Sequence, residues 1–124
     1  MKKTILVVDD SKDVRKFVKE ALLSENFNVI TAEDGEDCFR KLKNNNVDLI
    51  LLDIVMPGLT TEEILSEFKR QKLQIPVILF SITRSWEMVE KAKKVGYKIN
   101  DYIEKPFSSD NLLKKIKAVF ETKP

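Results

Sequence analysis

The order of apolar and polar positions along the chain predicts five short strands. Apolar residues gather in runs at 5–8, 29–32, 49–52 and 77–80, and a weaker pair stands at 102–103. The first, third and fourth runs are uninterrupted, which is typical of strands that are covered on both faces, as in a parallel sheet. The pattern therefore favours a sheet with helices on each side.

Between and after these runs, apolar side chains recur at helical spacing. The basic residues of the first such segment are expected to face outward; they are Lys12, Arg15, Lys16 and Lys19. The five apolar stripes are Val14, Phe17, Val18, Ala21 and Leu22; Cys38, Phe39 and Leu42; Ile64, Leu65 and Phe68; Trp86, Val89, Ala92 and Val95; and Leu112, Leu113, Ile116, Val119 and Phe120.

Residues at the ends of these segments fit helix caps and stops. Thr60 followed by Glu63 fits a capping box, in which each residue bonds the backbone N–H of the other. The other expected caps and stops are Asp34 before the second helix, Gly96 after the fourth, and Ser108 or Ser109 before the fifth.

Strands that alternate with helices predict an α/β fold with right-handed crossovers. We expect a three-layer α/β/α sandwich of (βα)5 form, with a five-stranded parallel sheet in the flavodoxin-like order 2-1-3-4-5. No linker, repeat or low-complexity segment interrupts the chain. Residues 1–124 are therefore expected to form one domain.

Composition narrows the chemistry. The chain has 124 residues, no histidine and one cysteine, Cys38, which excludes a histidine base, a histidine zinc site and an internal disulfide. Its net charge of +2 favours neither direct nucleic-acid binding nor an anionic membrane. The apolar run at 5–8 is too short for a secretory signal, and no segment approaches a membrane span. A cytoplasmic protein is expected.

Polar residues follow the predicted strands at one edge of the sheet. They are Asp9 and Asp10 after the first strand, Asp53 after the third, Ser81 after the fourth and Lys105 after the fifth. In the expected order the first and third strands are neighbours at the switch point, so the three carboxylates converge. Close carboxylates need a counter-charge, and oxygen ligands suit Mg²⁺. A Mg²⁺ ion beside a nucleophilic carboxylate, with a lysine and a hydroxyl, is the arrangement that phosphoryl transfer uses.

Simpler roles for the same residues remain open. Asp9 and Asp10 could cap the first helix, and Asp53 could be a turn residue. Ser81 could satisfy backbone groups at a strand end, and a strand tyrosine such as Tyr102 is often a core residue. The joint placement of the three aspartates favours a site.

Four motifs stand in order at the predicted strand ends. They are ILVVDDS (5–11), DLILLDIVMPG (48–58), PVILFS (76–81) and DYIEKPF (101–107). Each motif is weak alone, but the four in this order are specific. On these motifs the sequence resembles a single-domain response regulator receiver of the chemotaxis type, part of two-component signal transduction, over essentially its whole length.

The resemblance implies a phosphoprotein that acts as a signalling phosphoacceptor rather than an enzyme, beyond self-catalysed phosphotransfer and autodephosphorylation. Asp53 would accept a phosphoryl group from a phosphohistidine of a sensor histidine kinase or phosphotransfer protein. Asp9, Asp10 and Asp53 would bind Mg²⁺ together with the backbone carbonyl of Val55. Lys105 would pair with the phosphoryl oxygens.

The resemblance also implies a switch. Ser81 would move toward the phosphoryl group and Tyr102 would turn inward. The face of the fourth helix, fifth strand and fifth helix would then change its affinity for a downstream protein partner. Only residues 122–124 follow the last predicted helix, so we expect the output to come from a partner, although a domain cut from a longer protein would look the same.

The sequence departs from the family pattern in four places. Ile82 stands where alanine or glycine is usual, and its bulk is expected to slow phosphorylation or change the donor. Thr60 and Thr61 replace a common Asp-Gly, with Thr60 available as a replacement cap. The segment 96–102 is two residues longer than usual. Val55 and Thr83 offer no strong acid or amide to position water, which favours a longer-lived phosphoryl form.

Three other functions compete with the phosphoacceptor. A pseudo-receiver would use the fold as a phosphorylation-independent binding module, but the intact aspartates and Lys105 count against it. A flavin-binding flavodoxin needs a phosphate loop after the first strand, where Asp9 and Asp10 would repel phosphate. A dehalogenase-type phosphatase would carry Asp-x-Asp there and usually a longer chain.

Overall fold

The computed structural model describes residues 2–81, 86–104 and 107–121. In these residues, strands and helices alternate along the chain as the sequence predicts. The elements are β1 (Thr4–Val8), α1 (Lys12–Ser24), β2 (Asn28–Ala32), α2 (Gly35–Asn44), β3 (Leu49–Asp53), α3 (Thr61–Arg70), β4 (Val77–Ser81), α4 (Trp86–Lys94), β5 (Asp101–Glu104) and α5 (Ser109–Glu121).

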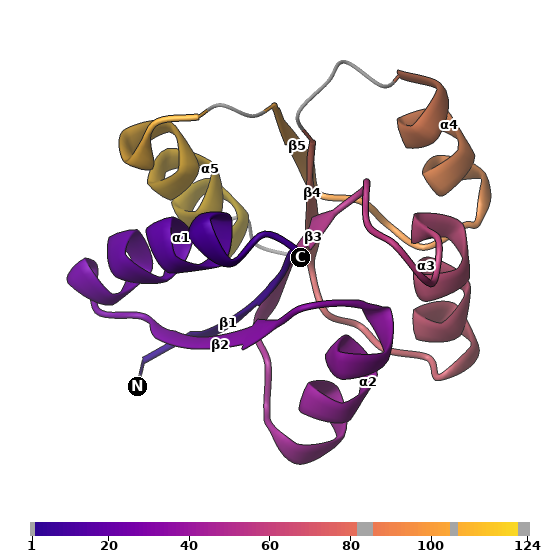
Figure 1. The fold of residues 1–124 in the computed structure, drawn as a ribbon, viewed down its shortest axis with the longest axis horizontal. Helices are drawn as coiled ribbons and strands as arrows, with labels where there is room; N and C mark the ends of the chain where they lie inside the picture. Colours follow the sequence, from indigo (N-terminus) through magenta and orange to yellow (C-terminus); the bar gives the residue numbers. More distant parts are fainter. Residues whose placement is uncertain (1, 82–85, 105–106, 122–124) are drawn as a thin grey trace.

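The strands form one parallel sheet in the order β2-β1-β3-β4-β5, which confirms the predicted fold class (Figure 1). β1 therefore lies between β2 and β3. Val8, the last residue of β1, pairs with Ala32 on one side and Leu52 on the other. The residues that follow β1 and β3 consequently leave the sheet side by side.

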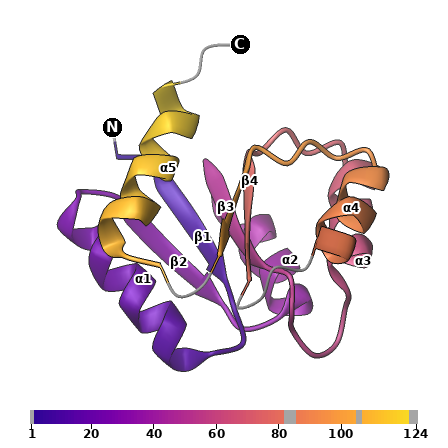
Figure 2. The same cartoon turned by 90° about the horizontal axis from the view of Figure 1, so that it is seen from above.

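Helices cover both faces of the sheet. α1 and α5 lie on one face and α2, α3 and α4 on the other, in both views (Figures 1 and 2). Successive residues of β1 enter different cores: Ile5 and Val7 pack on the α1 and α5 side, and Leu6 and Val8 on the other. A strand with both faces buried needs an uninterrupted apolar run, which is why the sequence shows one.

The predicted helix caps are present. Thr60 Oγ1 accepts from Glu63 N at 3.1 Å, and Thr60 N donates to Glu63 Oε1 at 2.9 Å, so the capping box is complete. Asp34 Oδ1 accepts from Asp37 N at 2.8 Å. Of the two candidate serines before α5, Ser108 is the cap, since its Oγ accepts from Asn111 N at 3.0 Å.

Two expectations about α1 are wrong. Phe17 was placed in the buried stripe, yet it is 45% exposed, because the face that α1 buries is narrower than the stripe. Its ring contacts Phe107, with the ring centroids 6.0 Å apart. Arg15 was expected to point outward, but it is half-buried and donates from Nη1 to the Asp9 carbonyl oxygen at 2.6 Å.

The fourth apolar stripe is described in part. Ala92 is buried and Val95 half-buried, as expected, whereas the side chains of Trp86 and Val89 lie outside the described residues. α4 ends at Lys94, and Gly96 follows with a φ of 90°, the left-handed backbone that glycine adopts without strain. Within the described part of the chain, none of the helices combines the length and the apolar character that a membrane crossing requires.

Candidate metal centre

Three aspartates meet where β1 and β3 end. Asp9 and Asp10 directly follow β1, and Asp53 is the last residue of β3. Each of these aspartates offers a carboxylate oxygen, and the three oxygens lie within 4.8 Å of one another. The convergence that the strand order predicts is therefore present.

The cluster is buried at its base and open on one side. Asp9 is 0% exposed and Asp53 3% exposed, whereas Asp10 is an exposed residue. A molecule in solvent can thus reach the cluster past Asp10, while the other two carboxylates are held in the wall. Such burial of carboxylates is unusual in the absence of compensating groups.

The two buried carboxylates are fixed by the same kind of local turn. Asp9 Oδ1 accepts from Ser11 N at 2.7 Å, and Asp53 Oδ1 accepts from Val55 N at 3.1 Å. In each case an aspartate side chain bonds the backbone two residues ahead, as in an Asx turn. The chain therefore sets the direction of each carboxylate at the point where it leaves the sheet.

The capping alternative for Asp9 and Asp10 does not hold, because Ser11 is the N-cap of α1. Its Oγ accepts from Val14 N at 3.3 Å. Asp9 N in turn donates to Ala32 O at 3.1 Å, so its backbone continues the pairing with β2. The two aspartates are thereby left outside the helix, beside Asp53.

The loop after Asp53 is tied down by a buried threonine. Thr61 is 3% exposed, and its Oγ1 donates to Ile54 O at 3.2 Å. Thr60 and Thr61, which stand where the receiver family that the sequence resembles commonly has Asp-Gly, thus have separate roles. Thr60 caps α3, and Thr61 holds the turn that carries Asp53 and Val55.

Sequence reasoning missed Arg15 as a neighbour of this site. Its guanidinium contacts the backbone of Asp9 rather than a carboxylate. The positive charge of Arg15 therefore stands beside the acidic cluster. The sequence did not reveal this contact, because helical spacing alone does not show which side of the first turn of α1 faces the strand ends.

The donor set fits a hard divalent cation. Three clustered carboxylates repel one another unless a positive charge is added, and carboxylate oxygens with an open side suit Mg²⁺, which keeps several waters. Among the described residues, these three aspartates form a cluster of ligand-type side chains that could hold a metal ion. Asp9, Asp10 and Asp53 would be the residues that bind it.

The other predicted site residues are placed only in part. Val55 is 49% exposed, and its backbone lies directly beyond Asp53. Tyr102 is half-buried in β5 and packs against the core on the α2, α3 and α4 side. Lys105, Ile82, Thr83 and the side chain of Ser81 lie outside the described residues. The backbone of Ser81 pairs with Glu104, the residue before Lys105.

Comparison with known proteins agrees with this geometry. The model of a family described as the response regulator receiver domain matches residues 5–117. The chain is 34% identical over 120 residues to the response regulator ArlR of Staphylococcus aureus. The matched region covers 97% of this chain and 53% of that protein. The chain therefore spans about half the length of the curated relatives that it matches.

Solved structures share the whole fold. The chemotaxis protein CheY4 of Vibrio cholerae is 29% identical, with a TM-score of 0.88 over 96% of this chain and 99% of that chain. The response regulator TrrA of Thermotoga maritima, solved in complex with Mg²⁺ and BeF, is 34% identical, with a TM-score of 0.81 over 94% of this chain and 98% of that chain.

Proposed function

Because this chain belongs to the response regulator receiver domain family, we propose that Asp53 is its phosphoacceptor and that phosphorylation switches it between two states. Members of the family are signalling proteins of two-component systems rather than ordinary enzymes. The observation that carries the proposal is the convergence of Asp9, Asp10 and Asp53 at the ends of neighbouring strands. We also propose that residues 1–124 act as one receiver domain.

In the proposed reaction, a carboxylate oxygen of Asp53 attacks the phosphorus of a phosphohistidine on a sensor kinase or phosphotransfer protein. A bond from the aspartate oxygen to phosphorus forms, and the bond from phosphorus to the imidazole nitrogen breaks. The electron pair of the broken bond stays on the imidazole, and an acyl phosphate is left on Asp53. The Asx turn with Val55 holds the attacking carboxylate in place.

Asp9 and Asp10 would hold Mg²⁺ together with Asp53 and the carbonyl oxygen of Val55. When bound, the ion supplies positive charge that offsets the negative charge of the phosphoryl oxygens. Asp9 is buried and fixed by Ser11 N, and Asp10 is at the solvent side. The chain thus presents one rigid and one accessible ligand beside the nucleophile.

Lys105 would pair with the phosphoryl oxygens from the end of β5. Ser81 would donate a hydrogen bond to them, and Tyr102 would follow by turning inward. These three residues would link the phosphoryl site to the face of α4, β5 and α5, which would bind the downstream protein. We place this exchange in the cytoplasm, with no direct nucleic-acid or membrane contact.

Intact-mass measurement after treatment with acetyl phosphate tests the proposal. The wild type should gain one phosphoryl group with Mg²⁺ and none with EDTA. Asp53→Asn, which keeps the shape of the side chain, should gain none under either condition. Asp110→Asn changes an exposed aspartate in the first turn of α5 and should label like the wild type.

Two results would count against the phosphoacceptor. Labelling of Asp53→Asn at the wild-type rate would place the phosphoryl group elsewhere. A folded wild type that gains no mass with acetyl phosphate, and that does not respond to beryllofluoride, would favour the phosphorylation-independent binding module.

A further inference from the structure

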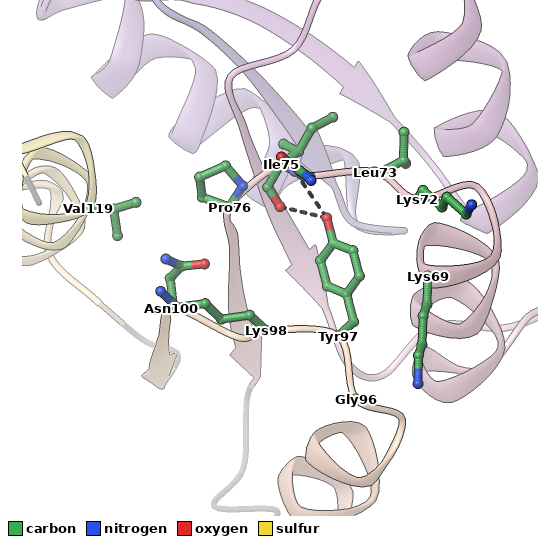
Figure 3. Close-up of a pocket in the computed structure, with 11 residues that line it drawn as sticks. Lys69, Lys72, Leu73, Ile75, Pro76, Gly96, Tyr97, Lys98, Asn100 and Val119 are labelled. Atoms are coloured by element: carbon green, nitrogen blue, oxygen red, sulfur yellow. Dashed lines mark hydrogen bonds between the residues drawn. The ribbon is translucent and has the colours of Figure 1, made fainter. Parts of the chain in front are cut away.

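A surface hollow lies at the opposite pole of the sheet from Asp53. A cavity of about 770 Å³ opens between the end of α3, the segment that leads into β5, and the end of α5 (Figure 3). Pro76 and Asn100, which line it, stand just before β4 and β5, whereas the aspartates stand after β1 and β3. The volume is in the range of small-molecule sites.

The lining combines an apolar floor with a basic rim. The rim carries Lys69 and Lys72 on the α3 side and Lys98 on the side of β5, as Figure 3 shows. Among the described residues that line the cavity, none is acidic. The apolar part is Leu73, Ile75, Pro76 and Val119. For a protein with a net charge of only +2, this is a marked local excess of positive charge.

Lys69 is held in position at the wall. Its Nζ donates to Val95 O at 3.1 Å, at the end of α4. Gly96 leaves the room for this contact, because a Cβ at residue 96 would stand 2.8 Å from Lys69 Nζ. The ammonium therefore reaches the cavity with one of its donors already engaged and its direction set.

Lys72 is the less expected residue. Its φ is 58°, in the left-handed region that residues other than glycine and asparagine rarely adopt. Lys72 N and the next backbone N–H bond back to the last turn of α3, and the two residues after α1 that begin at Asn26 make the same pair of hydrogen bonds. The φ of Asn26 is 69°. The turn alone would be served better by glycine or asparagine, so the lysine needs another reason, and strained positions often have a functional one.

Helix termini explain only part of the basic rim. Cations in a last turn offset the helix dipole, which accounts for Lys69. Lys72, two residues beyond α3, is still at that helix end, whereas Lys98 lies in the segment between α4 and β5, where this explanation does not apply. Their common feature is that both line the same cavity.

The walls of the cavity are fixed by polar contacts across the chain. Tyr97 is buried, and its hydroxyl donates to Ile75 O at 2.7 Å and accepts from Ile75 N at 3.2 Å (Figure 3). Asn100 accepts at Oδ1 from Val77 N at 3.3 Å, and its own N–H donates to Val77 O at 2.8 Å. A cavity between two tied segments is preformed, which lowers the cost of binding.

We propose that this cavity binds a phosphorylated small molecule with an apolar ring system, of the nucleoside triphosphate class. The phosphates would lie against Lys69 and Lys72 on the α3 side and the ring against the apolar floor, where Lys98 approaches the ligand from the opposite side of the cavity (Figure 3). Binding here is separate from phosphorylation of Asp53, since the two sites lie at opposite ends of the strands.

Titration of the ¹⁵N-labelled protein with ATP, without divalent cations, tests this inference. Without a metal the aspartate cluster repels phosphate, so only the basic cavity should respond. We expect saturable shifts of the backbone amides at 72–75 and 96–100. Adenosine and inorganic triphosphate, used as separate probes, should each bind at least about tenfold more weakly than ATP, because each engages one half of the site.

Lys72→Gly is the most informative variant. It removes the charge and relieves the left-handed strain, so the protein should melt at a higher temperature while ATP binds about fivefold to tenfold more weakly, as for the loss of one charge-assisted hydrogen bond. Lys98→Gln should weaken ATP by a similar factor. Asn26→Gly is the backbone control and Lys43→Gln, at an exposed position of α2, the charge control; neither should change ATP affinity.

Several outcomes would overturn the inference. These are no saturable shift at millimolar ATP, shifts that map elsewhere, or triphosphate binding as tightly as ATP. Equal weakening by Lys43→Gln and Lys98→Gln would also do so, since it would indicate a general charge effect. Asp53→Asn should bind ATP normally, and Lys72→Gly should still label with acetyl phosphate, so the two proposals fail separately.

Discussion

At the scale of single residues, Lys72 is held in a backbone conformation that an L side chain disfavours. Its φ of 58° follows α3, and Lys72 N and Leu73 N bond back to the last turn of that helix. We predict that Lys72→Gly raises the free energy of unfolding by about 1 kcal/mol, because glycine adopts this conformation without a Cβ clash.

Urea unfolding measures this effect as a higher midpoint with an unchanged slope. Asn26→Gly, at the equivalent position after α1, should give a smaller gain, since asparagine tolerates the left-handed region. A loss of stability in Lys72→Gly would show that the lysine side chain is worth more to the fold than the strain it causes.

Cys38 is a buried thiol that should make stability depend on alkaline pH. Burial raises its pKa to about 12, with the nearby Asp37 and Asp34 adding to the effect, whereas the ordinary value is 9.0. The folded state therefore binds the thiol proton more tightly than the unfolded state. The stabilising contribution is complete below pH 9 and is lost as the pH rises from 9 toward 12.

The measurement is the difference in unfolding free energy between wild type and Cys38→Ala as a function of pH. Above pH 9 the wild type should lose about 1.4 kcal/mol per pH unit relative to the variant. Other groups that titrate there cancel in the difference. A constant difference from pH 8 to pH 10 would contradict the assigned burial, as would rapid labelling of the native thiol by a disulfide reagent at pH 8.

At the scale of elements, the start of α3 rests on a reciprocal cap. Thr60 and Glu63 exchange two hydrogen bonds there. We predict that Thr60→Ala lowers the unfolding free energy by about 1 kcal/mol, because the hydroxyl oxygen that accepts from Glu63 N is lost. Thr60→Ser, which keeps the hydroxyl, should retain most of the stability in the same urea experiment. Equal losses in both variants would mean that the methyl group matters, not the cap.

The segment between α4 and β5 is anchored by Tyr97. Its hydroxyl satisfies both backbone groups of Ile75, and its ring packs against Phe68 with centroids 5.5 Å apart. Tyr97→Phe keeps the ring but leaves those groups without this partner. We predict a loss of about 1 to 2 kcal/mol in unfolding free energy.

Hydrogen exchange locates the effect of that substitution. The amide of Ile75 should exchange faster in Tyr97→Phe, whereas the amide of Leu79, in the middle of β4, should change only by the global loss of stability. Unchanged exchange at Ile75 would show that the hydroxyl does not hold the segment.

Local features of the elements could be predicted from sequence, and long-range ones could not. Thr60, Asp34 and the serine pair before α5 carry their capping signal within three or four residues. The contact of Tyr97 with Ile75 joins segments 22 residues apart and leaves no periodic signal. The inward turn of Arg15 was missed for a related reason: helical spacing gives a face, but not which neighbour that face meets.

At the scale of the whole molecule, the strand order gathers the acidic residues at one pole. Asp53 is far in sequence from the adjacent pair Asp9 and Asp10, and the three meet because β1 and β3 are neighbours. This much followed from the uninterrupted apolar runs and the residues that end them. The basic cavity at the other pole did not, since its lysines come from two connecting segments and a helix end, and only the fold brings them together.

The two poles also explain how a net charge of +2 coexists with concentrated sites. The acidic pole attracts a cation and, through that cation, a phosphoryl group, whereas the basic pole attracts an anion directly. Chemistry at Asp53 and binding at Lys72 are therefore expected to respond oppositely to the removal of divalent cations. The first should fail, and the second should persist.

The most direct test of the central claim identifies the phosphorylated residue itself. Wild-type protein is treated with acetyl phosphate and Mg²⁺, the acyl phosphate is reduced with borohydride, and the peptides are sequenced by mass spectrometry. Hydride reduction releases phosphate and converts a phosphorylated aspartate to homoserine. We predict homoserine at residue 53 and aspartate at residues 9 and 10. Homoserine at residue 9 or 10, or unmodified aspartate at all three, would contradict the account.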